Sequence, residues 1–205
     1  HAAVYDAERH QMLVFSGYYA YGNYLNDLWA LDLNTMTWRQ LSPGGSVPSQ
    51  RRGMASALDT ARAQWLLFGG FIHVGNFFDD LFYLDPADNT FTQVPQGLAR
   101  PQEALWATMT YLPASDQVVL FGGMNLDWYG GDWRVHTLRD TWFLERPSNS
   151  WSQVQSYLWA PPSRSGHVAF PHGGRYLGIF GGLHADEPGV AIGAEVPLND
   201  LWIFD

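Results

Sequence analysis

The chain has 205 residues, 46% of them hydrophobic and 16% aromatic, which is enough for one domain with a sizeable core. The formal net charge of −9 argues against nucleic acid or anionic membrane as a partner, because both need a basic surface. Cysteine is absent, so these residues hold no disulfide, no Cys-ligated zinc and no cysteine nucleophile. No apolar run approaches the length of a membrane span, no signal peptide is recognisable, and the cellular compartment stays open.

One pattern recurs four times. An apolar run ends in two small residues, usually Gly-Gly, and a segment of the type Asn-Asp-Leu-Trp follows it; Phe15, Phe68, Phe121 and Phe180 mark the runs at steps of 53 to 59 residues. Periods of about 50 residues with strand-like content indicate the blades of a β-propeller. We assign a structural role to the residues that carry the repeat: Phe15, Gly17, Asp27, Trp29, Trp38, Gly69, Gly70, Asp80, Gly122, Gly123, Asp140, Trp142, Trp151, Gly181, Gly182, Asp200 and Trp202.

Each unit opens with two predicted strands joined by a short polar turn. The first strand is rich in small residues, which suit the crowded centre of a propeller, and is expected at 1–6, 54–59, 107–112 and 167–171. The second strand is a continuous apolar run, as in a strand buried on both faces, and is expected at 13–15, 65–68, 118–121 and 176–180.

Two further strands complete a unit. The third is expected at 28–33, 81–84, 141–144 and 201–204, and turns rich in Asn, Asp, Pro and Ser follow it. The fourth is expected at 37–41, 90–94 and 150–154, and the fourth unit lacks it. The units therefore cover about 1–50, 51–103, 104–163 and 164–205 of a single domain.

The pattern resembles the kelch repeat over essentially the whole chain. An Arg-x-Gly-His-like opening occurs at 164–167 and, less well, at 51–54, whereas 104–107 departs from it; Ser16 replaces the first Gly, and Phe82 and Phe91 replace Trp. The resemblance implies an all-β, kelch-type β-propeller with four recognisable four-stranded blades, the last one incomplete. We expect a segment of a larger propeller, because an open stack leaves blade faces uncapped. A closed four-bladed ring or an assembly of two chains is the alternative.

The connections on one propeller face are the candidate binding site. They are predicted as loops at 18–25, 71–78, 124–138 and 183–198, together with the linkers 42–50, 95–103 and 155–163. Long loops on a rigid scaffold commonly carry function, and exposed Trp, Tyr and Arg anchor protein interfaces. The candidate partner-binding residues are Tyr18, Tyr19, Arg52, Phe71, His73, Asp127, Trp128, Tyr129, Trp133, His184 and Asp186. Alternatively, these aromatic rings pack the loops themselves.

Other chemistry is less favoured. Asp27, Asp80, Asp140 and Asp200 recur at the start of the third strand, so we expect them to cap loops by backbone hydrogen bonds. His73, His136 and His184 come from different blades without close ligand spacing, so neither a metal nor another cofactor is predicted. The sequence contains no nucleophile elbow, phosphate-binding loop or dinucleotide fingerprint, and no catalytic residue is assigned.

Three functions are consistent with these features. A protein–protein interaction module is favoured, with another protein as the partner and no membrane insertion. A carbohydrate-binding or carbohydrate-processing propeller is the first alternative, since the loops combine aromatic rings with acids such as Asp127, Asp132, Asp186 and Glu187. A structural component of a large assembly is the second, because fold does not decide function.

Overall fold

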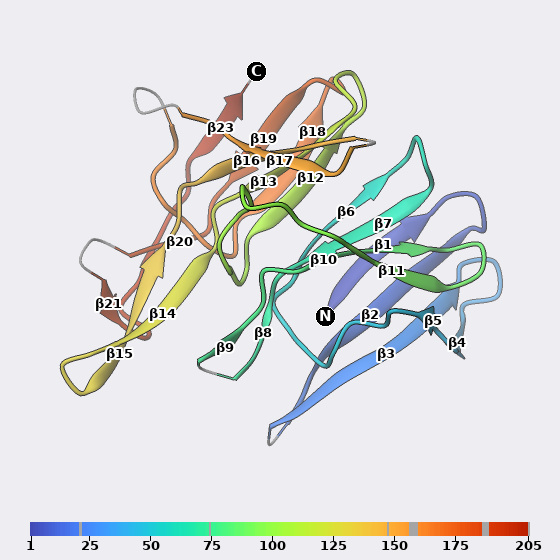
Figure 1. Ribbon diagram of the computed structural model, residues 1–205, viewed down its shortest axis with the longest axis horizontal. Helices are drawn as coiled ribbons and strands as arrows, with labels where there is room; N and C mark the ends of the chain where they lie inside the picture. The colour runs from blue at the N-terminus through green and yellow to red at the C-terminus, as the bar shows by residue number, and fades with distance from the viewer. Residues whose placement is uncertain (21, 74, 147, 156–159, 186–188, 205) are drawn as a thin grey trace.

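A computed structural model describes residues 1–205 except 21, 74, 147, 156–159, 186–188 and 205. Its regular elements are β-strands, most of them in four sheets (Figure 1). Within the described residues no helix is long and apolar enough to cross a membrane.

The first two sheets contain residues 2–41 and 44–94. The first has the order β1-β2-β3-β4, with β1 (Ala2–Asp6), β2 (Gln11–Tyr19), β3 (Asn23–Asp32) and β4 (Thr37–Leu41). The second has the order β5-β11-β10-β7-β6, with β5 (Gly44–Gly45), β6 (Ala55–Asp59), β7 (Gln64–Phe68), β10 (Leu81–Asp85) and β11 (Thr90–Val94).

The other two sheets contain residues 108–153 and 168–204. The third has the order β12-β13-β16-β17, with β12 (Thr108–Leu112), β13 (Gln117–Phe121), β16 (Thr141–Glu145) and β17 (Ser150–Gln153). The fourth has the order β18-β19-β23, with β18 (Val168–His172), β19 (Tyr176–Phe180) and β23 (Leu201–Phe204). The first strands β1, β6, β12 and β18 contact one another in that order, so they form the inner edge of the arrangement. The all-β propeller architecture predicted from the repeat is confirmed.

The segments predicted as loops between the second and third strands are not simple loops. They contain additional strands: β8 (Phe71–His73), β9 (Asn76–Phe77), β14 (Met124–Tyr129), β15 (Asp132–Thr137), β20 (Leu183–His184), β21 (Val190–Ala191) and β22 (Val196–Pro197). In the first unit, β2 and β3 continue past a bulge between Phe15 and Gly17 and pair as far as Tyr19 and Asn23. The prediction was wrong because the glycines that end each apolar run redirect the chain without ending the pairing.

Packing between sheets repeats from unit to unit. The Phe15 and Phe91 ring centroids lie 4.8 Å apart, and those of Phe68 and Trp151 lie 5.6 Å apart. In both cases an aromatic residue on the fourth strand of one unit covers the phenylalanine that ends the second strand of the unit before it. Trp38 occupies the same repeat position as Phe91 and Trp151 but is 50% exposed.

The glycine pair of the repeat allows close contact between backbones. Gly70 has φ +87°, and a Cβ added there would lie 2.7 Å from the Arg52 carbonyl oxygen. Such a contact requires glycine both for its backbone angle and for the missing side chain. Ser16 stands at the first glycine position of the first unit with φ 60°, and its hydroxyl lies 2.6 Å from the Arg51 carbonyl oxygen. This hydrogen bond accounts for a serine at that position.

The repeated aspartates do more than the predicted loop capping. Asp200 accepts bidentate hydrogen bonds from the guanidinium of Arg164, at 2.7 and 2.8 Å, and Asp80 accepts the equivalent pair from Arg51. The arginine of the opening motif is therefore a side-chain partner of both aspartates, and Asp200 also accepts the indole N–H of Trp202, at 2.6 Å. Ala104 replaces that arginine in the third unit.

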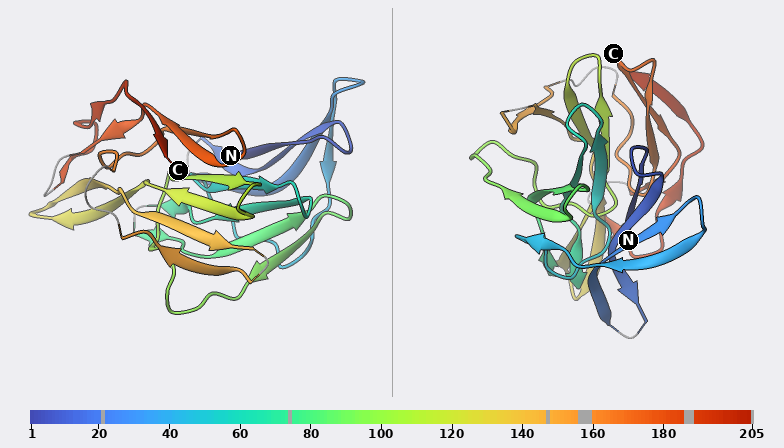
Figure 2. Two further views of the ribbon diagram at one scale, coloured as in Figure 1. Left: turned by 90° about the horizontal axis from the view of Figure 1, so that it is seen from above. Right: turned by 90° about the vertical axis from the view of Figure 1, so that its right-hand side faces the viewer.

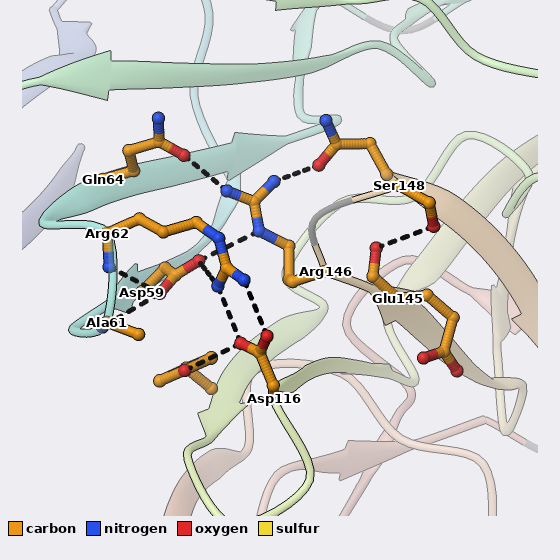
Figure 3. A network of polar contacts seen from close by, with 10 residues as sticks. Asp59, Ala61, Arg62, Gln64, Asp116, Glu145, Arg146 and Ser148 are labelled. Atoms are coloured by element: carbon orange, nitrogen blue, oxygen red, sulfur yellow. Dashed lines mark hydrogen bonds and ion pairs between the residues drawn. The ribbon is translucent and has the colours of Figure 1, made fainter.

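A second polar network joins the second and third sheets at the ends that lie away from the glycine pairs (Figure 3). Asp59 is fully buried and accepts hydrogen bonds from Arg62, at 3.0 Å, and from Arg146, at 2.9 Å. Arg62 also makes a bidentate contact with Asp116, at 2.7 and 2.6 Å, and Arg146 contacts Gln64. Because Asp59 and Gln64 belong to one sheet and Asp116 and Arg146 to the next, these contacts tie the two sheets together.

The buried His167 predicts an acid-sensitive stability. Burial lowers the pKa of its imidazole from 6.5 to about 4, and the positive charge of Arg164 adds to the shift. A depressed folded-state pKa means that this stabilisation is complete above pH 6.5 and is lost as the pH falls toward 4. We expect the free energy of unfolding to fall by on the order of 3 kcal/mol in that window.

Urea denaturation at several pH values between 7 and 4 measures this loss. His167→Gln keeps a polar group beside the Thr108 hydroxyl, which lies 2.7 Å from the imidazole, but does not titrate. The decline between pH 6.5 and 4 should therefore be shallower in the variant. Equal slopes for the two proteins would show that His167 is not its source.

Candidate functional site

The added hairpins gather on one face of the molecule. In Figure 1 the tips of β2–β3, β8–β9 and β14–β15 all lie along the lower and left edge of the view, and Figure 2 shows β14–β15 extending beyond the sheets. We call the described residues of 17–25, 71–77, 124–137 and 183–197, together with Arg52, Leu105 and Trp106 beside them, the hairpin face. β15 also pairs with β21, which joins the hairpins of the third and fourth units.

The hairpin face has a hydrophobic core of its own. Phe71, Leu105, Met124, Val135 and Ala185 are all buried and form one cluster. These residues come from the second, third and fourth units, so the cluster holds the added segments of these three units together. A fixed layer can hold exposed side chains in place for binding with little loss of conformational entropy.

Four of the predicted site residues lie at the first two units. Tyr18 and Tyr19 are 45% and 70% exposed, and the Arg52 guanidinium lies 4.5 Å from the centroid of the Tyr18 ring and 4.6 Å from that of Phe71. Phe71 itself is buried. The structure thus brings Tyr18, Arg52 and Phe71 together, with Tyr19 at the exposed end of the same strand.

Three other predicted residues lie on the β14–β15 hairpin. Trp128 is 60% exposed and its ring meets that of Trp133 edge-on at 5.2 Å. Asp127 is exposed, and its carboxylate lies 3.4 Å from the imidazole of His136. Trp128 and Trp133 are directly opposite one another in the pairing, so they present one aromatic surface.

Two further predicted residues, His73 and His184, lie apart from these. His73 is exposed at the end of β8. The imidazole of His184 instead lies 3.0 Å from the hydroxyl of Ser163, which in turn lies 2.8 Å from that of Thr137. Asp186 and the side chain of Tyr129 lie outside the described residues.

The described histidines and acids show no metal-like grouping. Within the described residues no three or more His, Cys, Asp or Glu side chains are placed to hold a metal ion. The carbohydrate alternative needs two acids about 5–10 Å apart across a substrate, and it stays a prediction here.

Sequence reasoning missed Trp106. It is 43% exposed, has φ 55°, and its ring lies 6.3 Å from Phe71. Gly53 and Gly166 occupy the same position in the second and fourth units, with φ 72° and 62°. The departure of 104–107 from the opening motif was the signal that could have identified it. A tryptophan where the repeat uses a left-handed glycine is strained, and strained residues concentrate at binding sites.

Comparisons with known proteins agree on the repeat type. A family model described as the KLHDC2/KLHL20/DRC7 Kelch-repeats domain matches residues 1–182. Tip elongation aberrant protein 1 of Schizosaccharomyces pombe is 31% identical over 208 residues, which cover 100% of this chain and 17% of that protein. Host cell factor of Drosophila melanogaster is 28% identical over 190 residues, which cover 84% of this chain and 12% of that protein.

A solved structure supports the fold. The structure of YjhT superposes with a TM-score of 0.67 at 16% sequence identity, covering 88% of this chain and 48% of that one. At this identity the similarity concerns the fold alone. The chain spans well under a third of the length of the curated relatives above, so it corresponds to one region of each of them.

Proposed function

Because this chain belongs to the kelch-repeat family, we propose that it binds another protein and that the hairpin face is the surface that does so. Kelch-repeat domains are generally protein–protein interaction modules. The choice of face rests on one observation, the set of exposed aromatic residues on the hairpins and beside them: Tyr18, Tyr19, Trp106 and Trp128. Tyrosine and tryptophan dominate binding energy at interfaces because they bury a large area with few rotatable bonds.

The opposite ends of the sheets are less suited to this role. They carry the network around Asp59, whose charged groups are already paired with one another. The linkers 42–50 and 95–103 were expected on this face as well, but part of the first lies at the other end of the second sheet, where Gly44 and Gly45 pair with Thr90 and Phe91 next to the β10–β11 turn.

A paired substitution tests the proposal. Tyr19→Ala combined with Trp128→Ala removes two exposed rings and no buried one, so the fold should persist while binding weakens at least about 10-fold. The matched control is Met36→Ala with Trp38→Ala, which removes two exposed side chains at the opposite end of the first sheet.

The measurement has two steps. Proteins that co-purify with the wild-type chain are identified first, and the affinity of one purified partner is then measured for all three chains. Loss of binding in the control pair, with full binding by the hairpin variant, would contradict the proposed face. A bound polysaccharide in place of a protein would favour the carbohydrate alternative.

A further inference from the structure

Arg52 is held in a fixed position on the hairpin face. Its guanidinium lies 4.5 Å from the Tyr18 ring centroid, 4.6 Å from that of Phe71 and 5.8 Å from that of Tyr24. The backbones of Arg52 and Phe71 exchange two hydrogen bonds of 2.9 Å, which lock the stacked pair together. Stacking on aromatic faces does not use the in-plane N–H donors of a guanidinium, so they stay available for hydrogen bonds.

These donors have no acceptor among the described residues. No carboxylate in the described part of the chain forms an ion pair with Arg52, and its Nε is buried without a hydrogen-bond partner. Arg51 and Arg164, by contrast, each have an aspartate of their own unit. The equivalents of Arg52 in the next two units are Leu105 and Ser165, so this charge is not part of the repeat.

Trp106 packs against the same Phe71 ring as Arg52 and offers a second hydrogen-bond donor. Its ring lies edge-on to Phe71, and a Cβ added to Gly53, the neighbour of Arg52, would lie 3.3 Å from the indole nitrogen. The indole N–H makes no hydrogen bond to the described residues, and the side chain is 43% exposed. The backbone of Trp106 is in the left-handed region, and its partly exposed indole shares the Phe71 ring with the Arg52 guanidinium.

We propose that Arg52 and Trp106 form a recognition site for an aspartate or glutamate side chain on a peptide segment of the partner. The inference rests on the proposed function of the hairpin face. A planar guanidinium fork and an indole N–H both donate, and a carboxylate supplies two acceptor oxygens in a matching geometry. The apolar rings of Tyr18 and Trp106 fit the side chains that flank the acid. A doubly charged phosphate is disfavoured, because a single cation on a chain of net charge −9 does not neutralise it.

Selection from a phage-displayed library of random dodecapeptides tests this chemistry. Peptides selected on the wild-type chain are synthesised, and their affinities are measured for the wild type and for Arg52→Met, which keeps an apolar stem between the rings. We expect a shared Asp or Glu, and a loss of roughly 10-fold or more when that residue becomes Asn or Gln or when Arg52 becomes Met. Arg139→Met, which removes an exposed positive charge outside the cluster, should leave the affinity unchanged.

A second variant separates binding from folding. Trp106→Gly restores the residue found at this position in two other units, so its thermal midpoint should equal or exceed that of the wild type while peptide binding falls. Peptides that need Tyr19 and Trp128 but bind Arg52→Met normally would overturn the acid site and leave the proposed face intact. Peptides indifferent to all of these residues, or an empty selection, would count against both proposals. Tighter binding when phosphoserine replaces the acid would overturn the choice of carboxylate.

Discussion

Asp200→Ala should lower the free energy of unfolding by about 3–5 kcal/mol. Arg164 is fully buried, and its guanidinium donates to both carboxylate oxygens of Asp200, to the Gly181 carbonyl at 2.9 Å and to the Pro162 carbonyl at 3.2 Å. Removing Asp200 leaves the carbonyl contacts in place but no negative charge opposite the buried cation. Leaving a buried charge without a partner costs more free energy than the ion pair contributed to stability, so the expected loss is large.

The third unit supplies a matched control. Asp140 occupies the same repeat position as Asp200, but Ala104 stands where the arginine would be. Asp140→Ala should therefore cost less than about 1 kcal/mol. Urea unfolding at pH 7 compares the two variants under one condition, since hydrogen bonds from Arg164 hold the pKa of Asp200 well below its usual range and keep it ionised. Equal losses at the two positions would mean that the Arg164 pair is not the cause.

The repeat made most of the fold readable from sequence. Phe15, Phe68 and Phe121 fix the unit length, and each predicted strand was found within two or three residues of its place, except that β2 and β3 are longer. Short apolar runs between polar turns leave little choice of secondary structure when the same run recurs four times. The hairpins after each run were not predicted, because their pairing depends on backbone geometry at Ser16 and the glycine pairs.

The sequence predicted which region holds the candidate site, but not how its side chains contact one another. Tyr18, Arg52 and Phe71 were each named from residue type and loop position, but stacking of the guanidinium between the rings requires the pairing of Arg52 with Phe71 across two segments. The segment that contains Trp106 was interpreted as a weakened opening motif. The sequence shows that the glycine is missing, but it does not show the positive φ that the tryptophan adopts in its place. The Arg164–Asp200 pair could have been predicted, because Arg51 and Asp80 stand at the same two repeat positions in the second unit.

Side-chain contacts between units were the feature of the fold that was hardest to predict from the sequence. Asp59 and Arg146 are 87 positions apart. The aspartate is not a constant feature of the repeat: Asp6 and Asp59 share a position in the first two units, but Leu112 and His172 occupy it in the last two. The repeat therefore gives no sign of the contact. The link is specific to one pair of sheets. It predicts that these two sheets are more strongly coupled than a repeat with uniform interfaces would be.

Asp59→Asn should lower the free energy of unfolding by about 3–5 kcal/mol, as expected for a buried charge network that loses one member. The side chains of Asp59 and Arg146 are 0% and 2% exposed, so neither can exchange its partner for water. Asp59 also accepts the backbone amides of Ala61 and Arg62, each at 3.1 Å. The amide can retain those turn contacts through its oxygen, but its nitrogen replaces the oxygen that accepts from Arg62 and Arg146, so the variant loses both the charge and these two hydrogen bonds.

Asp6→Asn separates the link between sheets from the turn. Asp6 is also buried and accepts the amides of Glu8 and Arg9, but the contacts of its carboxylate stay within the first sheet. We expect it to cost about 1–2 kcal/mol, the usual value for hydrogen bonds to a charged group. Adding Arg146→Met to Asp59→Asn should recover part of the larger loss, because it removes the buried cation that Asp59→Asn leaves unpaired. Strictly additive losses in the double variant would show that Asp59 and Arg146 stabilise their own turns independently, and that the contact between the sheets contributes little.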